Sequence, residues 1–180
     1  GATLDLSVVA VSVKKNNTTG TSAWMGQFTG KLHLRAPQND AGTDLLMNPL
    51  NSSILGASSI IAEGYRLYDL TASGGTISTA VQNQIRSDGT TFLGAAGTTS
   101  ANYGTMTGRL LSNNGGLDSL LVLSPGAEII NPTGDLTLSS DWDLSTFRFG
   151  PTREVVIGTD ESGNPLTMTV ATEPGVLTLR

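Results

Sequence analysis

A short motif recurs along this chain and limits the folds open to it. The motif is a glycine, one spacer residue and two leucines separated by one polar residue, and it occurs at residues 30–34, 134–138 and 175–179. Looser copies lie at 1–6 and 126–130. Alternating aliphatic residues are typical of a strand with one buried face. Short strands that each begin at a glycine corner are what a stacked coil of parallel β-rungs requires.

The spacing between the copies is irregular, so the chain contains no strict repeat period. A β-sandwich with long loops would show the same strand pattern. Both alternatives are all-β, and a chain with 22 glycines and 14% charged residues suits either of them. The recurrence of the motif favours the β-solenoid.

The residue inventory excludes several classes of function. The formal net charge is −5 and the 10 Lys and Arg residues form no basic stripe, so nucleic acid is not an expected partner. The chain has no cysteine and one histidine, which removes disulfides, thiolate zinc sites and the usual catalytic triads. No run approaches the ~18 consecutive apolar residues of a membrane helix. We expect no cofactor, no metal and no enzymatic activity.

One stretch departs from the strand pattern. Residues 76–96 carry apolar side chains at helical spacing, with Thr76 or Ser78 available as the N-cap and Gly97 beyond the end. Gly89 is the point at which this helix would be interrupted. Its polar face lacks the Lys and Arg residues of interfacial helices, so we expect the apolar face to cover the solenoid rather than a membrane.

A second helical pattern covers residues 103–111. The sequence therefore predicts β-solenoid rungs in 1–75, a helical insertion in 76–116 and further rungs in 117–180. Within the last part, two strand patterns flank a polar loop and predict a projecting hairpin near 155–170.

The C-terminal third contains the most distinctive sequence of the chain. It resembles a signature of the large filamentous-haemagglutinin-like exoproteins, which are passengers of bacterial two-partner secretion, and the resemblance rests on four runs, 126–129, 134–144 (GDLTLSSDWDL), 148–150 and 173–180. Upstream runs resemble consecutive parts of the same region, namely 30–37, 56–65 and 68–71. The resemblance covers most of the chain and is weakest at 14–27 and 155–172.

The resemblance implies a right-handed parallel β-helix, exported through an outer-membrane two-partner-secretion transporter of a Gram-negative bacterium and then secreted or held at the cell surface. Family chains are much longer, and both ends here lie inside strand motifs, so we expect a section of a longer solenoid. The expected role is a rigid adhesive rod for attachment, cell-cell contact or biofilm, or a stalk carrying a toxin. Its expected partners are glycans or proteins of host or bacterial surfaces, and further copies of itself.

The best candidate for a chemical site is the cluster of Asp141, Trp142 and Asp143 with Arg148 and Arg153. Two carboxylates beside an aromatic ring could hold calcium or stack a sugar, as in a carbohydrate-active β-helix enzyme. The alternation of this run is strand-like, however. We therefore expect the two acids on the outer face in a local Asp–Arg pair, and Trp142 packed inward or under a loop. A third alternative is a self-assembling extracellular fibre subunit.

The single histidine and the remaining polar loops are expected to be structural. His33 stands between two leucines, so its side chain should point away from the core towards solvent. The acidic run 160–164 lacks the spacing of a calcium loop and is expected to be a hairpin tip. The glycines at 74–75 and 94–97 do not follow the strand-to-helix order of a phosphate loop and are expected to be turns. No catalytic, cofactor-binding or metal-binding residue is assigned.

Overall fold

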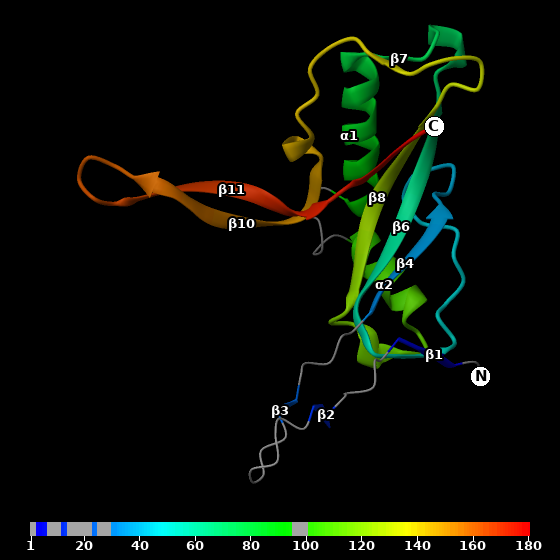
Figure 1. Ribbon diagram of the computed structural model, residues 1–180, viewed down its shortest axis with the longest axis vertical. Coiled ribbons are helices and arrows are strands. Elements are labelled where there is room, and N and C mark those ends of the chain that lie inside the picture. The colour runs from blue at the N-terminus through cyan, green and yellow to red at the C-terminus, as the bar shows by residue number, and fades with distance from the viewer. Residues whose placement is uncertain (1–2, 7–11, 14–22, 25–29, 95–100) are drawn as a thin grey trace.

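A parallel sheet of four strands forms the centre of the molecule. The computed structural model describes residues 3–6, 12–13, 23–24, 30–94 and 101–180. The four strands are β4 (Gly30–Pro37), β6 (Ala57–Asp69), β8 (Leu121–Ile130) and β12 (Val176–Leu179). They lie side by side in the order in which the chain reaches them, and every neighbouring pair is parallel (Figure 1).

Two shorter pairs of strands are also parallel. β1 (Thr3–Asp5) pairs with β5 (Ser53–Leu55), and β7 (Thr76–Ile77) pairs with β9 (Thr137–Leu138). Between β5 and β6 the chain turns at Gly56, whose φ of +69° is costly for any residue with a Cβ. Gly56 therefore forms a corner between two strands, at a position other than the predicted corners Gly30, Gly134 and Gly175. Within the described ranges the parallel strands form a curled open sheet, and they do not close into a β-helix.

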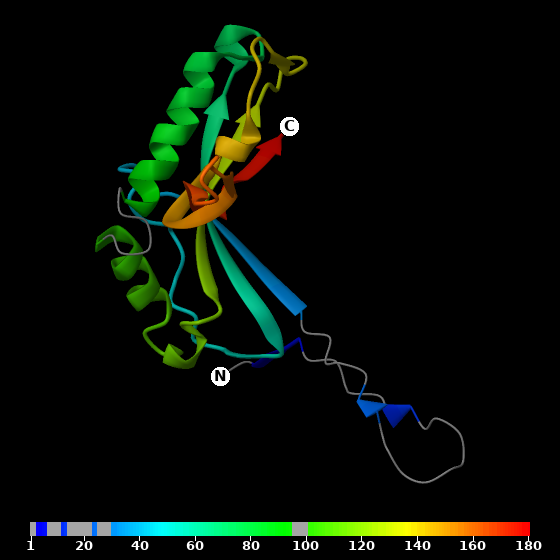
Figure 2. The same cartoon turned by 90° about the vertical axis from the view of Figure 1, so that its left-hand side faces the viewer.

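Two helices cover one face of this sheet (Figure 2). α1 (Thr79–Leu93) begins after Ser78, whose hydroxyl accepts a hydrogen bond from the Val81 amide at 3.5 Å, as the sequence predicted. It ends at Gly94 instead of near Gly97 and runs without a break. α2 (Ala101–Leu110) confirms the second helical pattern. The described residues also include three short 3₁₀ turns: η1 (Thr71–Ser73), η3 (Gly115–Leu117) and η4 (Leu144–Thr146).

The core lies between the helices and the sheet, and glycines there make room for phenylalanine rings. A Cβ built on any of three glycines would come within 2.2 to 2.5 Å of a ring carbon, in the pairs Gly64 with Phe92, Gly89 with Phe149, and Gly175 with Phe147. Gly89 lies inside the unbroken helix α1, so the predicted interruption there is wrong. The absence of a Cβ at Gly89 lets the Phe149 ring pack against the helix.

The predicted hairpin is present and longer than expected. β10 (Arg148–Thr159) and β11 (Pro165–Pro174) form an antiparallel ribbon that projects away from the sheet and helices (Figure 1). A smaller antiparallel pair joins β2 (Ser12–Val13) and β3 (Ala23–Trp24). No helix in the described ranges is long and apolar enough to cross a membrane.

Candidate functional site

The sheet face opposite α1, called here the outer face, carries a cluster of charged side chains. Gly64 contacts Phe92 on the helix side, so its neighbours Glu63 and Tyr65 point to the outer face. The register of the parallel strands places Arg35 of β4 beside Glu63 of β6. Charged and aromatic groups of adjacent strands therefore meet on one surface.

Arg35 is the centre of this cluster. Its Nε donates a hydrogen bond to Glu63 Oε1 at 3.0 Å, and one of its terminal nitrogens donates to Glu128 Oε2 at 2.6 Å. Its guanidinium also lies 3.8 Å from the centroid of the Tyr65 ring. Burial lowers the pKa of Arg35, but the hydrogen bonds with Glu128 and Glu63 outweigh it, and the net pKa is raised. Arg35 therefore stays charged and joins three strands.

Each carboxylate of the cluster has a second basic side chain nearby. His33 Nε2 lies 2.8 Å from Glu63 Oε2, which has no hydrogen-bond partner, and Arg180 lies 3.1 Å from Glu128 Oε1. The Glu63 side chain is only 1% exposed. It is accommodated because Gly126 on the neighbouring strand has no Cβ, which would come within 2.2 Å of Glu63 Oε1.

A groove of about 420 Å³ adjoins the cluster at the end of β4. It is lined by residues 37–40, which leave β4, and by residues 65–67 of β6. Tyr65 belongs to both the cluster and the groove. Gln38 donates from Nε2 to the Gly64 carbonyl at 2.8 Å, while its Oε1 is buried and has no hydrogen-bond partner. The groove thus combines an aromatic ring with amide and carboxylate groups.

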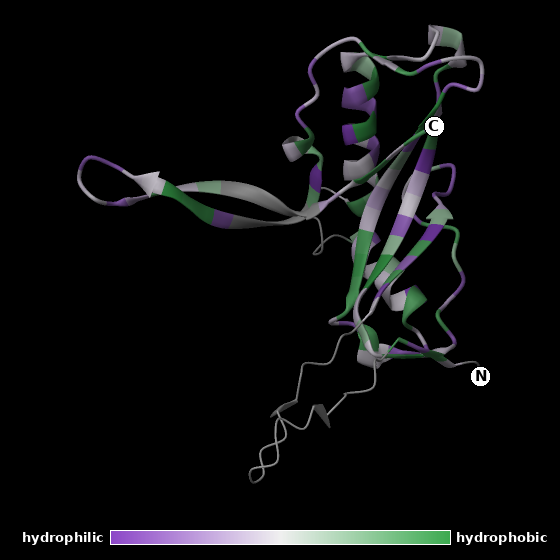
Figure 3. Ribbon diagram, viewed as in Figure 1, coloured by the Kyte–Doolittle hydropathy of each residue, from purple (hydrophilic) through white to green (hydrophobic). Residues whose placement is uncertain are grey.

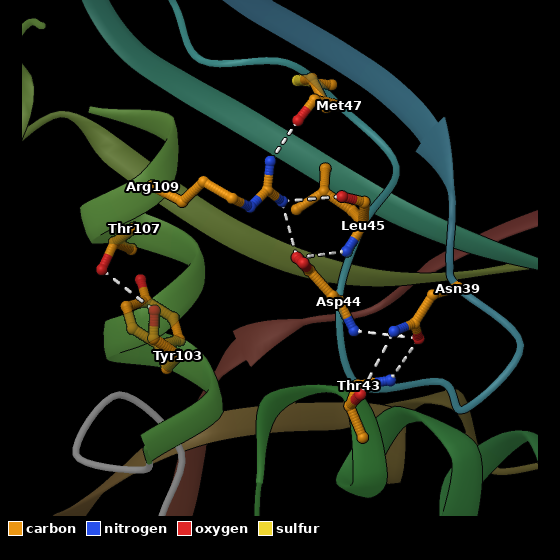
Figure 4. A network of polar contacts seen from close by, with 8 residues as sticks. All are labelled: Asn39, Thr43, Asp44, Leu45, Met47, Tyr103, Thr107 and Arg109. Atoms are coloured by element: carbon orange, nitrogen blue, oxygen red, sulfur yellow. Dashed lines mark hydrogen bonds and ion pairs between the residues drawn. The ribbon is translucent and has the colours of Figure 1, made fainter. Parts of the chain in front are cut away.

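Helix α2 holds the loop that lines this groove (Figure 4). Asn39 Oδ1 accepts hydrogen bonds from the amides of Thr43 and Asp44 at 2.9 and 3.2 Å, which closes the loop on itself. Arg109 of α2 donates to Asp44 Oδ1 at 2.6 Å and to the Leu45 carbonyl at 2.8 Å, and it also donates to the carbonyl of Met47. The position of the loop therefore depends on a side chain more than 60 residues away in sequence.

The opposite wall of the groove is tied to α1. Arg66 lies 3.5 Å from Asp88 Oδ1, and the Tyr68 hydroxyl donates a hydrogen bond to Asp88 Oδ2 at 2.8 Å. Burial, and then this hydrogen bond to Asp88, raise the pKa of Tyr68, so the phenol stays protonated. Both walls of the groove are held by helices that pack on the other face of the sheet.

The residues of the predicted Asp–Trp–Asp cluster make contacts that stabilise the local fold. Asp141, Trp142 and Asp143 lie in a loop before η4, so the expected strand-like alternation is wrong. Asp143 Oδ1 accepts a hydrogen bond from the Ser145 amide at 2.9 Å and caps η4. Hydrogen bonds from Ser145 lower the pKa of Asp143, and the charge of Arg86 on α1 adds to this effect.

The other members of the predicted cluster are Trp142, in the same loop, and two arginines on β10. Trp142 is half-buried and packs edge-on against Phe147 with ring centroids 6.3 Å apart, which confirms the expected inward packing. Arg148 and Arg153 lie on β10 of the hairpin. Among the residues that the structure describes, no group of three or more His, Cys, Asp or Glu side chains could hold a metal ion.

Two further expectations concern polar residues. His33 points to the outer face as predicted and is 46% exposed, but it faces the buried Glu63 and not only solvent. The run 160–164 is the hairpin tip, where Asp160 Oδ1 accepts hydrogen bonds from the amides of Ser162 and Asn164 at 2.9 and 2.8 Å. Glu63 and Glu128 are not among the predicted site residues, although a glutamate inside each of two apolar strands is a visible signal in the sequence.

No family model, curated protein or solved structure matches this chain at a significant level.

Proposed function

We propose that this chain is a structural section of a secreted filamentous-haemagglutinin-like exoprotein, a rod whose surface contacts other cells. The observation that carries the proposal is the chain order of the parallel strands: β4, β6, β8 and β12 follow one another in sequence and in the sheet. Sequential parallel stacking is characteristic of solenoid proteins, in which each turn contacts its neighbours.

The proposed rungs follow the path of an open, incompletely closed right-handed parallel β-helix, the hand that parallel crossovers adopt in nearly all proteins. β1 and β4 form the first rung, β5, β6 and β7 the second, β8 and β9 the third, and β12 the fourth. The helices α1 and α2 replace strands on the remaining side. The ion pairs of Arg35 with Glu63 and Glu128 join three successive rungs and support the stacking.

Export tests this proposal directly in the source bacterium. An antibody against the chain should detect the protein in the medium or on the cell surface, and deletion of the outer-membrane transporter that exports it should abolish that signal. A protein found only in the cytoplasm of both strains would contradict the proposal.

The groove beside Tyr65 is the proposed adhesive contact, and a surface glycan is its proposed ligand. Sugar hydroxyls pair well with amides and carboxylates such as Asn39 and Asp40, and sugar rings pack on aromatic faces. Asp40→Ala should abolish binding of the purified chain to a glycan array. Glu161→Ala, which removes an exposed acid at the hairpin tip, is the matched control and should bind as the unaltered chain does. Equal binding by both variants would exclude the groove.

A further inference from the structure

The turn that follows α2 contains the pair Asn114–Gly115. No other asparagine of the sequence is followed by glycine. Such a pair is chemically labile, because glycine has no side chain to hinder attack of its backbone nitrogen on the side-chain amide of the preceding residue. Asn113, Gly115 and Gly116 are exposed and Asn114 is partly buried. The reacting groups therefore lie at the surface of the protein.

The side-chain amide of Asn114 holds another part of the chain in place. Its Nδ2 donates hydrogen bonds to the carbonyl of Leu50 and, at 3.3 Å, to the carbonyl of Ser52. The neighbouring Asn113 donates from Nδ2 to Asn51 Oδ1 at 2.5 Å. The turn after α2 therefore fixes the segment that leads into β5.

This turn can open while the core stays intact. It connects two buried apolar parts of the chain, the end of α2 at Leu110 and the start of β8 at Leu121. Figure 3 shows the start of β8 as a hydrophobic stretch. Among the described residues, nothing lies within 4 Å of a Cβ built on Gly115 or Gly116. Because local opening of an exposed turn costs far less free energy than global unfolding, we expect short-lived openings in the folded protein.

We propose that Asn114 deamidates spontaneously in the folded protein and that the product releases the segment before β5 from the turn. The Gly115 nitrogen bonds to Cγ of Asn114 and loses its proton, the Cγ–Nδ2 bond breaks, and ammonia leaves with that proton. Water then opens the succinimide ring at one of its two carbonyl carbon–nitrogen bonds and yields aspartate or isoaspartate. The side chain must first leave the carbonyls of Leu50 and Ser52, so the turn opens before the ring closes.

The product does not suit the contacts that Asn114 makes. Aspartate has no amide hydrogen to donate, and its carboxylate would face the carbonyl oxygens of Leu50 and Ser52, which repel it. Isoaspartate would also add one carbon atom to the backbone of the turn. Either product therefore favours the open turn. This inference does not depend on the adhesive role proposed above.

The first test follows the reaction by mass spectrometry. The folded chain, incubated at mildly alkaline pH, should gain the mass of one deamidation, and fragmentation should locate it at Asn114. The chain in urea should convert faster, because its turn is always open. Gly115→Ala should slow the conversion about tenfold, since a methyl group hinders the attacking nitrogen. Gly116→Ala is the matched control, with equally open surroundings, and should convert as the unaltered chain does.

The second test measures the effect of the product. The Leu50 amide donates to the Leu110 carbonyl at 2.8 Å. Asn114→Asp should raise the hydrogen-exchange rate of this amide about tenfold, because two hydrogen bonds that hold the segment are lost. Asn83→Asp makes the same change at an exposed position of α1 and should leave the rate unchanged.

Three results would overturn the proposal. The first is a folded chain that shows no conversion at Asn114 during the time in which the chain in urea converts fully. The second is an equal rate of conversion in Gly115→Ala and Gly116→Ala. The third is an Asn114→Asp variant in which the Leu50 amide exchanges as it does in the unaltered chain.

Discussion

Single residues decide how closely a side chain of the helices can approach the backbone of the sheet, and Gly64 is the clearest case. A Cβ built on residue 64 would lie only 2.4 Å from the nearest ring carbon of Phe92 in α1. Gly64→Ala should therefore lower the free energy of unfolding in urea by about 1–3 kcal/mol through overpacking. Gly104→Ala is the control, since nothing lies within 4 Å of its Cβ and alanine favours the helix by up to about 1 kcal/mol. Equal effects of both substitutions would contradict this packing account.

The ion pairs of the outer face are a second property of single residues. Arg35→Met would leave the carboxylate of Glu63 buried with only His33 near it, and Glu128 with only Arg180. We expect a loss of about 1–3 kcal/mol in urea unfolding, because Arg35 itself is partly exposed but the Glu63 carboxylate that it leaves unpaired is buried. Lys31→Met, on the same strand and outer face but outside the cluster of ion pairs, should change stability by less than about 0.5 kcal/mol. A loss in both variants would assign the effect to the strand instead of the cluster.

The hairpin turn depends on one carboxylate, which makes its order sensitive to pH. Hydrogen bonds from Asn164, and then from the backbone of the tip, hold the pKa of Asp160 below its ordinary value. Since the lowered pKa favours the ionised form in the folded turn, the stabilisation is present at neutral pH and is lost as pH falls through that lowered pKa. The NMR amide shifts of Ser162 and Asn164 should therefore titrate at a pH below the ordinary pKa of aspartate. Asp160→Asn should abolish this titration, and a midpoint above the ordinary value would refute the assignment.

Local sequence signals identified the helices and the hairpin because the interactions that define them are local. Ser78 caps α1 through its own side chain, and the loop at 160–164 closes through Asp160. The same reasoning was wrong at Asp141 and Asp143. Their alternation with apolar residues imitates a strand, but contact of Trp142 with Phe147 and capping of η4 by Asp143 impose a loop. Tertiary packing overrides periodicity when a run is short.

At the scale of the whole molecule, the parallel stacking predicts an uneven distribution of stability. β6 and β8 each have strand neighbours on both sides, whereas β11 pairs only with β10 within the described ranges. Amide hydrogen exchange at low protein concentration should be slowest in β6 and β8 and fastest in the distal half of the hairpin. Equal protection of β8 and β11 in dilute solution would be inconsistent with this architecture.

The sequence by itself determined the strand-rich class, the two helices and the hairpin, because alternation, capping and turn residues act over a few positions. Only the tertiary structure decided that β4, β6, β8 and β12 stack in chain order, since irregular insertions between them hide any period in the sequence. It also decided the candidate site. Arg35 meets Glu63 across 28 residues and Glu128 across 93, and the groove loop is held by Arg109 from a separate helix. Strand register and helix docking bring these partners together, and both are properties of the folded chain.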